Sequence, residues 1–349
     1  MNIFENPLYQ RQLEEIINIL PPTDSSLLIT GASGLIGSFL VDCLIKANRD
    51  HGRNFLIYAL GRRLEKLTSR FDYATDSDHL HLMAADICEP LGNSQHYDYI
   101  IHAASNADPK SYAIYPAETL LTNILGTKSV LDYAKENKET RVLLASTFEV
   151  YGDAGKNGII TEESTGIIDF HVLRNCYPSS KVSAELLCQS YAEEFGVDVV
   201  IGRLCGIYGP TMQANDSKAQ AQFIRNAVAG EDIVLKSKGE QVRSYCYVTD
   251  AVKALFTILL HGEKKEAYNI SDENSVMSIA DFAKMTAEVG GVNVVFNMPD
   301  AIEAKGFSRP VDVRMDNSKL KAIGWSCIHT VSERCKETIE ILKELNKWN

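Results

Sequence analysis

The residues best suited to chemistry in this chain are Tyr177 and Lys181, which stand four positions apart in the segment Tyr-Pro-Ser-Ser-Lys. On a helix they would lie on the same face, one turn from each other. An ammonium group at that distance stabilises a phenolate, so it would lower the pKa of the Tyr177 hydroxyl and let it act as a base near neutral pH. The chain contains 15 tyrosines, so this spacing alone could arise by chance. A second motif, earlier in the chain, makes chance a poor explanation.

That motif is a run of three glycines, Gly31, Gly34 and Gly37, between an apolar segment at 27–30 and an amphipathic segment at 35–47. The apolar segment predicts a buried strand, and the amphipathic segment predicts a helix. Gly31 permits a tight turn, Gly34 lets the backbone approach a pyrophosphate, and Gly37 lets the helix pack closely on the strand. The start of the helix presents backbone N–H groups and a positive dipole end to phosphates. A tight turn without a ligand is the alternative, but the position of the motif favours a dinucleotide.

The overall composition narrows the class of partner. The net charge of −11 leaves no basic surface with which to displace counterions from nucleic acid. The eight cysteines include no Cys-x-x-Cys pair, and no His-Glu-x-x-His occurs, so no metal site is expected. Scattered thiols are typical of a reducing compartment, and neither a signal peptide nor a membrane-spanning apolar run is found. We therefore expect a soluble cytoplasmic protein that binds a small molecule, with no nucleic-acid or membrane partner.

Bringing the candidate residues together requires a sheet whose strands end at a common edge. After the glycine turn, apolar segments alternate with helical ones, and this alternation predicts βαβ units in a doubly wound, parallel α/β sheet of the Rossmann type. The strands expected after the first are 55–60, 80–85, 97–104, 141–147 and 197–204. Ligands of such sheets bind beyond the carboxyl ends of the strands. Thr147 ends one of these strands and therefore belongs to the predicted site.

The alternation breaks in the C-terminal half, which predicts a smaller α/β lobe for the substrate. We expect the dinucleotide-binding domain to comprise 27–204 plus 243–274, and the substrate-binding lobe to comprise 205–242 plus 275–349. Residues 1–26 are expected to form an N-terminal helical extension that ends at Pro21-Pro22 and has its apolar side chains on one face. This extension would cover the outside of the sheet or contact another subunit.

The adenosine side of the predicted cofactor site departs from the usual pattern. The second strand of a dinucleotide fold normally ends in an acidic residue for the ribose, but here it continues as Gly61-Arg62-Arg63. An arginine there can accommodate a ribose 2′-phosphate, so NADP+ stays open beside NAD+; two solvated arginines at the start of a helix are the alternative. Asp86 could accept a hydrogen bond from the adenine amino group, and Asn123 would be a buried amide on the next helix. The residues expected to hold the dinucleotide are Gly31, Ser33, Gly34, Leu35, Ile36, Gly37, Arg62, Asp86, Ile87, Ala103, Ala104, Ser105, Asn123, Tyr177 and Lys181.

In this order the motifs resemble the extended short-chain dehydrogenase/reductases that act on nucleotide sugars, and the resemblance covers almost the whole chain from residue 27 onward. The segments that carry it are Thr30–Gly37, His102–Ser105, Asn123–Thr127, Ser146–Gly152, Tyr177–Lys181, Arg203–Pro210, Gly239–Asp250 and Lys319–Trp325. The resemblance implies that Tyr177 is the base on a sugar hydroxyl, that Lys181 holds the nicotinamide ribose and that Thr147 hydrogen-bonds the reacting oxygen. It also implies a homodimer, formed by the helices around 117–137 and 177–195.

Within that family, the residues after Thr147 indicate which reaction comes after oxidation of the sugar at C4. Sugar 4,6-dehydratases carry Thr-Asp-Glu, but Phe148 cannot protonate a leaving hydroxyl. The segment through Glu149 most resembles the Thr-Ser-Glu of UDP-glucuronate decarboxylases, which implies that Glu149 assists proton handling near C5 and is a substrate-binding and catalytic residue. Arg243 resembles the family arginine that contacts the substrate phosphate or the sugar acid. The alternative for Glu149 is a strand-end carboxylate that is hydrogen-bonded to the backbone. The alternative for Arg243 is a surface ion pair.

We therefore predict a UDP-glucuronate decarboxylase, with a nucleotide-sugar 4-epimerase or 4,6-dehydratase as the alternative. Gly206 stands where relatives often have an asparagine that contacts the diphosphate, so the identity of the substrate stays open. Cys176 and Cys205 fall near the site and are interpreted as packing residues. Two other classes of function remain as alternatives. A non-catalytic dinucleotide-binding regulator would not need the Thr-Tyr-Lys trio, and a net reductase that consumes NADPH would suit the arginines after the second strand.

Overall fold

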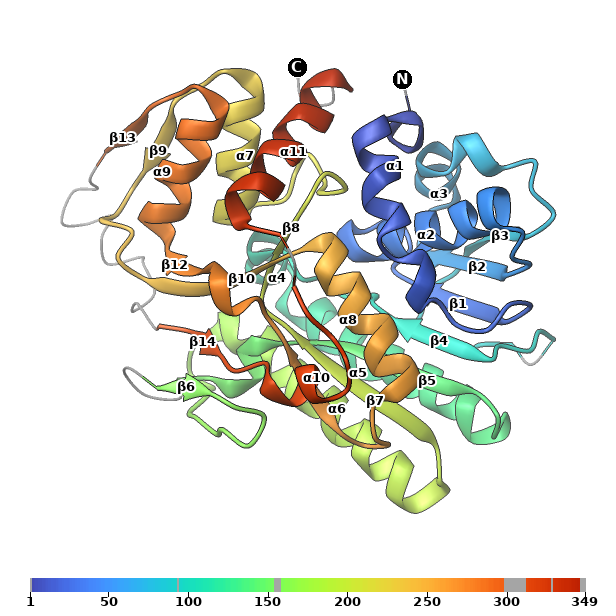
Figure 1. Ribbon diagram of the computed structural model, residues 1–349. Coiled ribbons are helices and arrows are strands. Elements are labelled where there is room, and N and C mark those ends of the chain that lie inside the picture. Colours follow the sequence, from blue (N-terminus) through green and yellow to red (C-terminus); the bar gives the residue numbers. More distant parts are fainter. Residues whose placement is uncertain (1, 93, 154–157, 298–311, 328, 346–349) are drawn as a thin grey trace.

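The computed structural model describes residues 2–92, 94–153, 158–297, 312–327 and 329–345. At its centre is a seven-stranded sheet in which every neighbouring pair of strands is parallel, in the order β11-β7-β5-β4-β1-β2-β3 (Figure 1). Its strands are β1 Ser26–Thr30, β2 Leu56–Gly61, β3 Leu80–Ala84, β4 Tyr99–His102, β5 Arg141–Thr147, β7 Asp198–Leu204 and β11 Ala267–Ile270. The doubly wound α/β fold is confirmed, and the expected strands agree with the observed ones to within two residues at each end.

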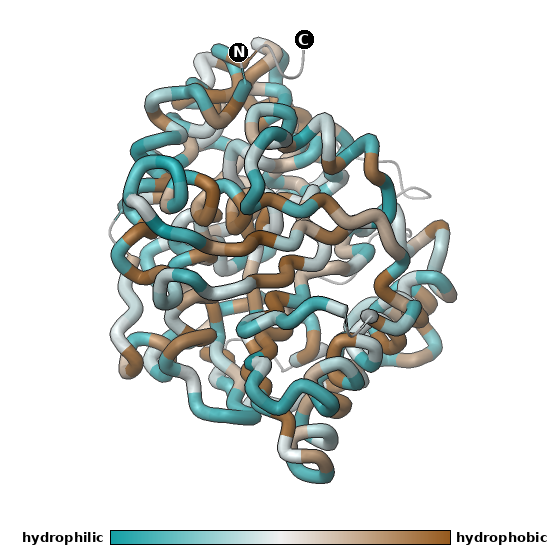
Figure 2. Tube along the Cα trace, turned by 90° about the vertical axis from the view of Figure 1, so that its right-hand side faces the viewer, coloured by the Kyte–Doolittle hydropathy of each residue, from teal (hydrophilic) through white to brown (hydrophobic). Residues whose placement is uncertain are grey.

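Both faces of the large sheet are buried. Leu27 and Ile29 belong to the hydrophobic core on one side and Leu28 to the core on the other, because successive side chains of a strand point in opposite directions. The first face is covered by α2 (Leu35–His51) and α8 (Val248–His261), and the second by α5 (Pro116–Glu136) and α6 (Cys176–Phe195). Burial on both sides explains why these strands are continuous apolar runs in the sequence. In Figure 2, apolar segments run through the centre and hydrophilic segments follow much of the outside.

The smaller lobe is built around three short sheets. Strand β10 pairs in parallel with β8 and antiparallel with β12, while β9 pairs with β13 and β6 with β14. Besides α1, the strands and α-helices outside the large sheet and its four covering helices are α3 Leu64–Arg70, α4 Pro109–Ile114, β6 Ile159–Ile160, β8 Gly206–Tyr208, α7 Ala219–Ala229, β9 Ile233–Leu235, β10 Val242–Tyr247, β12 Val276–Ser278, α9 Ile279–Gly290, β13 Val294–Phe296, β14 Arg314–Met315, α10 Ser318–Ala322 and α11 Val331–Glu344. Only Cys205 separates β7 from β8. The smaller lobe is therefore attached directly at the carboxyl end of the large sheet, where ligands are expected.

The N-terminal extension differs from the single helix predicted up to Pro21. Helix α1 (Pro7–Glu14) ends well before the prolines, because the Ile16 N–H bonds to the Leu13 carbonyl in a tighter 3-10 turn at 3.1 Å, and a short 3-10 helix follows. The extension packs against both lobes. The Tyr9 hydroxyl donates to Asp42 of α2 at 2.5 Å, and the Gln12 amide donates to Glu337 of α11 at 2.7 Å. The first and last helices consequently lie near one another in Figure 1.

Candidate active site

A cavity of about 930 Å³ opens between the carboxyl ends of the central strands and the smaller lobe. Its walls come from the glycine turn, the segments after β4 and β5, the first turn of α6, and the strand β10. All four predicted catalytic residues line it, namely Thr147, Glu149, Tyr177 and Lys181. The predicted substrate residue Arg243 lines it as well. The structure thus brings together residues from the glycine turn, β5, α6 and β10, which are far apart in the sequence.

The glycine turn is shaped by a close approach to the segment after β4. Gly31 has a φ of 69°, and a Cβ atom there would lie 2.8 Å from the Ala103 carbonyl oxygen, so only glycine fits without a shift. Thr30 joins the glycine turn to the segment after β4 by hydrogen bonds. Its hydroxyl accepts from the Ala104 N–H at 3.1 Å and lies 2.8 Å from His102 Nδ1. Because burial lowers the pKa of His102 to about 3, the imidazole is neutral when it shares this hydrogen bond with the Thr30 hydroxyl.

The residues at this turn fit a dinucleotide diphosphate. Helix α2 begins after Gly34, and no side chain caps its first N–H groups. Leu35 and Ile36, the first residues of this helix, line the cavity, so its uncapped N–H groups and positive dipole end lie at this end of the cavity. Ser105, also in the lining, has a buried hydroxyl that finds no hydrogen-bond partner in the described part of the chain. A polar ligand would satisfy these groups.

Tyr177 and Lys181 lie on the first two turns of α6, and both are almost completely buried. The Lys181 ammonium donates to the Ala145 carbonyl at 2.9 Å, and the Tyr177 hydroxyl shares a hydrogen bond with Thr147. The predicted lowering of the Tyr177 pKa by Lys181 is wrong for the protein alone. Burial raises the pKa of Tyr177 far above its usual value and the negative charge of Glu149 raises it further, while the bond to Thr147 opposes this only in part. Burial also lowers the pKa of Lys181, to about 8.

Glu149 follows β5 in a 3-10 turn (Phe148–Tyr151) whose first N–H groups are capped by Thr147, with the Glu149 N–H donating to its Oγ1 at 3.3 Å. The Glu149 carboxylate lies 3.6 Å from Arg174, so among the described residues its contact is an arginine and not the backbone. Burial raises the pKa of Glu149, and the charges of Arg174 and Arg243 counteract this only partly. A carboxyl with a raised pKa next to cations is suited to giving and taking protons.

Phe148 has a structural role that the sequence did not show. The Arg243 guanidinium lies 5.4 Å from the centre of the Phe148 ring, a cation–π contact. Burial lowers the pKa of Arg243, and within the described residues Arg243 has no ion pair. Arg243 is therefore held toward the cavity by an aromatic platform, with its hydrogen-bond donors available to an anionic ligand.

Arg174 and Tyr112 were not predicted as site residues, although both line the cavity. The Arg174 guanidinium donates to the Tyr112 hydroxyl at 2.9 Å, and the Tyr112 ring is stacked on the Tyr177 ring with centroids 5.1 Å apart. Arg174 is three residues before Tyr177, so proximity to that motif was an available signal. Tyr112 belongs to α4, and nothing in its sequence neighbourhood points to the site.

Two residues predicted to bind the cofactor do not line the cavity. The Asp86 carboxylate accepts from the Cys88 N–H at 3.0 Å. The Asn123 amide donates to Ser180 Oγ at 2.8 Å, and Ser180 in turn donates to the Tyr177 carbonyl at 2.7 Å. Asn123 therefore supports the first turn of α6, while its own side-chain oxygen is buried without a partner among the described residues.

Gly206 and the two nearby cysteines are explained by packing. A Cβ atom at Gly206 would lie 3.1 Å from the Tyr245 ring, so Tyr245 fills the space that a side chain there would need. Cys176 and Cys205 are buried, and Cys176 Sγ lies 3.7 Å from the Tyr112 carbonyl.

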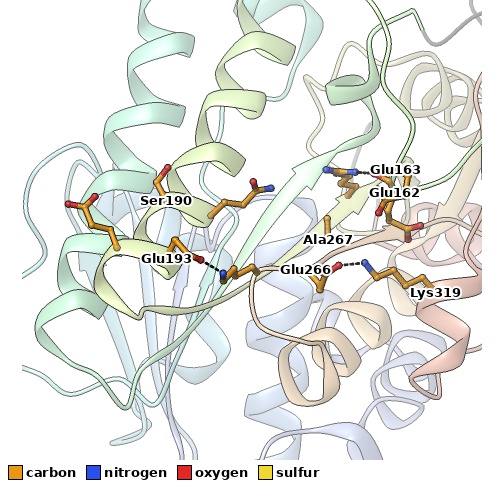
Figure 3. A pocket seen from close by; sticks show the side chains of 11 residues that line it. Glu162, Glu163, Ser190, Glu193, Glu266, Ala267 and Lys319 are labelled. Carbon is orange, nitrogen blue, oxygen red and sulfur yellow. Dashed lines mark hydrogen bonds and ion pairs between the residues drawn. The ribbon is translucent and has the colours of Figure 1, made fainter.

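A second hollow, of about 760 Å³, lies at the edge of the sheet beside β11 (Figure 3). Four of its eight charged side chains pair with one another, Lys265 with Glu193 and Lys319 with Glu266. Neither the glycine turn nor the Tyr177 region borders it. We therefore place the candidate active site in the larger cavity.

Two further properties concern the described residues. No three His, Cys, Asp or Glu side chains among them are grouped so that they could hold a metal ion. Within the same part of the chain, no helix has both the length and the apolar character needed to cross a bilayer.

A parallel sheet with a glycine turn after β1, a threonine at the end of β5 and a tyrosine and lysine on one face of α6 defines the class of extended short-chain dehydrogenase/reductase enzymes. Comparison with known protein families identifies the family within this class. The model of the "NAD dependent epimerase/dehydratase family" matches residues 27–271, and the chain belongs to that family of nucleotide-sugar enzymes.

Curated relatives agree with this membership, and a solved structure shows the same fold. The chain is 30% identical to UDP-glucuronic acid decarboxylase 1 of Xenopus tropicalis over 91% of its own length and 72% of the relative. It is 32% identical to UDP-glucuronic acid decarboxylase 6 of Arabidopsis thaliana over 86% of its own length and 83% of the relative. The structure of UDP-glucose 4-epimerase from Thermotoga maritima, solved with UDP-glucose, superposes with a TM-score of 0.78 at 22% identity and covers 92% of this chain and 100% of that one.

Proposed function

We propose that the protein oxidises a nucleotide sugar at C4 and then removes the carboxyl group at C5, as a UDP-glucuronate decarboxylase. The observation that carries this proposal is the meeting of Glu149 with Arg174 and Arg243 in the cavity that holds Tyr177. Two guanidinium groups suit a ligand with a sugar carboxylate and a diphosphate. The two relatives that are 30% and 32% identical bear the name of this activity.

The residues that would hold the dinucleotide are the glycine turn, the start of α2, the segment Ala103–Ser105 and the pair Tyr177 and Lys181. When bound, a nicotinamide adenine dinucleotide supplies an acceptor for the C4 hydrogen, a positive charge next to the phenol, and later the donor that returns the hydrogen. The pKa of Lys181, about 8, leaves its side chain mostly protonated at pH 7. Its ammonium group can therefore hold a ribose hydroxyl as a hydrogen-bond donor.

Tyr177 would take the proton of the C4 hydroxyl as C4 becomes a ketone. Its hydroxyl already shares a hydrogen bond with Thr147, so the threonine can hold the reacting oxygen in reach of the phenol. Tyr112, stacked on the Tyr177 ring, keeps the phenol in this orientation and excludes water from one of its faces. Burial raises the pKa of Tyr177 in the protein alone, and a positively charged nicotinamide in the cavity would oppose that shift.

The ketone at C4 turns the sugar acid into a β-keto acid. The bond between C5 and its carboxyl carbon can then break, carbon dioxide leaves, and the electron pair passes into the C4 carbonyl as an enolate. Glu149 would give its proton to C5 and regain one from solvent, which its raised pKa favours. Tyr177 returns its proton to the C4 oxygen when C4 is reduced again.

The alternatives are separated by the mass of the product. Incubation of the purified protein with UDP-glucuronate, and in parallel with UDP-, GDP-, CDP- and dTDP-hexoses, is followed by mass spectrometry and NMR. Loss of carbon dioxide supports the decarboxylase, loss of water indicates a dehydratase, and an unchanged mass with altered ring couplings indicates a 4-epimerase. Failure to release carbon dioxide from UDP-glucuronate while another sugar is converted would refute the decarboxylase. Phe148, engaged under Arg243, leaves no acid at the position that a dehydratase uses.

We further propose that the protein is a homodimer and works in the cytoplasm. The outer face of α5 and α6 exposes Leu121, Leu125 and Leu186, with fractional exposures of 54%, 40% and 56%. An exposed apolar face on two packed helices suits a second copy of the same helices, since this would remove the leucines from water. All eight cysteines are free thiols, which fits a reducing compartment.

A further inference from the structure

Three cationic side chains stand together at the end of β2. Arg62 and Arg63 follow the strand, and Lys66 is on the first turn of α3. All three line the same cavity as the glycine turn. The turn after β2 is fixed beside the glycine turn, because the Ala32 N–H donates to the Leu60 carbonyl at 3.1 Å. In a dinucleotide fold this is the place of the adenosine ribose.

The usual partner of an unmodified ribose is missing from this end of the cavity. A carboxylate at the end of the second strand normally accepts hydrogen bonds from the ribose hydroxyls. Among the described residues, the lining here consists of Leu60, Gly61, Arg62, Arg63, Lys66, Ala85 and Ile87. None of these is acidic. At Gly61, where a carboxylate would be expected, a Cβ atom would lie 3.2 Å from the Leu67 side chain, which would have to move.

The carboxylates nearest in the sequence do not replace it. Asp86 accepts from the backbone N–H of Cys88, and Glu65, on the same helix as Lys66, does not line the cavity. Glu118 pairs with Arg62 at 2.6 Å, and Arg62 also donates to Asn106 at 3.2 Å. Arg62 is thereby held at the rim of the cavity by groups outside the β2 turn.

Arg63 and Lys66, in contrast, are unpaired. Neither side chain has an ion pair or a hydrogen bond to another described residue. Both residues are exposed, and both carry a positive charge. Burial lowers the pKa of Lys66, and the charges of Arg63 and Arg62 lower it further. In a chain with a net charge of −11, two cations without partners at one end of a cavity indicate an anionic ligand.

We propose that Arg63 and Lys66, with Arg62 at the rim, bind the 2′-phosphate of an adenine dinucleotide, so that the protein takes NADP+ or NADPH in preference to the form without this phosphate. The proposal rests on the dinucleotide site of the proposed function and adds the identity of its ligand. A phosphate offers several acceptor oxygens and up to two negative charges. The arginine fork can bind it with two hydrogen bonds, while the lysine acts as a point charge.

The first experiment compares two ligand fragments that differ only in the phosphate. Binding of adenosine 2′,5′-bisphosphate and of 5′-AMP to the purified protein is measured by calorimetry at low and at moderate salt. We expect the bisphosphate to bind about 100-fold more tightly, since each charged contact is worth roughly tenfold in affinity. This advantage should shrink with added salt, because charge contacts at the cavity mouth are screened. Equal affinities, or tighter binding of 5′-AMP, would overturn the proposal.

The second experiment tests the residues. In the variant Arg63→Gln/Lys66→Gln, the affinity for NADP+ should fall about 100-fold while the affinity for NAD+ changes less than about threefold. The variant Lys284→Gln/Lys336→Gln removes two charges from exposed ion pairs outside the cavity and should change neither affinity. An unchanged preference in the first variant would overturn the assignment. Because these are binding measurements, they stay informative even if UDP-glucuronate is not the substrate.

Discussion

Replacing Arg174 should change the protonation of Glu149 by an amount that the structure allows us to estimate. The two charged groups are 3.6 Å apart. At that distance an effective dielectric constant of about 20 gives an attraction of roughly 4–5 kcal/mol as an upper bound. However, 42% of the Arg174 side chain is exposed, and solvent screening reduces such a pair to about 1 kcal/mol. This corresponds to somewhat less than one pKa unit.

The direction of the Glu149 pKa shift follows from the positive charge that the substitution removes. Arg174 favours the ionised form of Glu149, so the variant Arg174→Gln should raise further a pKa that burial has already raised. If Glu149 is the proton donor to C5, its protonated form is the active one, and activity falls as pH rises through its pKa. The alkaline limb of the pH profile of kcat should therefore move upward by nearly one pH unit in Arg174→Gln.

The assay is release of carbon dioxide from UDP-glucuronate at saturating substrate across the pH range. Arg174→Lys keeps a positive charge, so the alkaline limb of its pH profile should lie close to the wild-type pH. Lys110→Gln removes an exposed charge outside the cavity and should leave the limb at the wild-type pH. A 13C-NMR titration of the Glu149 carboxyl, assigned with Glu149→Gln, measures the same shift without turnover. If the limb and the NMR titration both stay at the wild-type pH in Arg174→Gln, the electrostatic reasoning is refuted.

Other variants test the catalytic residues, the glycine turn and the dimer face. Tyr177→Phe should abolish turnover while dinucleotide binding, measured by fluorescence, survives; near-normal turnover would remove Tyr177 from the mechanism. Glu149→Gln should still oxidise C4 but stall afterwards, so a keto-sugar and reduced nicotinamide should accumulate, and an unaffected overall rate would contradict its role. Gly31→Ala should destabilise the protein by about 2 kcal/mol or more in denaturant unfolding, and Gly230→Ala, which has a similar positive φ but open space around it, by only about 1 kcal/mol; equal losses would show that the close approach does not matter. Leu121→Arg should convert the dimer to a monomer in light scattering, and an unchanged mass would exclude this face.

Local patterns in the sequence were sufficient for the large sheet and for much of the site. The extent of the strands along the chain follows from the alternation of apolar and amphipathic segments, which is a local property. The glycine turn and the Tyr177 and Lys181 pair are equally local, since each motif lies within a few residues of one strand or helix. The position of Thr147 at the end of β5 is then a consequence of the rule that parallel strands place their carboxyl ends at one edge.

Contacts between elements that are distant in the chain could not be determined from the sequence. It showed that Phe148 is not an acid, but only the packed structure places the Arg243 guanidinium over its ring. It placed a lysine one turn from Tyr177, but burial outweighs that charge, and burial depends on everything that surrounds the phenol. The stacking of Tyr112 on Tyr177 and the pairing of Arg174 with Glu149 likewise join segments that no local pattern connects. The sequence by itself therefore determined the strands of the sheet, the glycine turn and the pairing of Tyr177 with Lys181 on one helix. Tertiary structure decided the electrostatic surroundings of that pair, because charge and burial act through space and not along the chain.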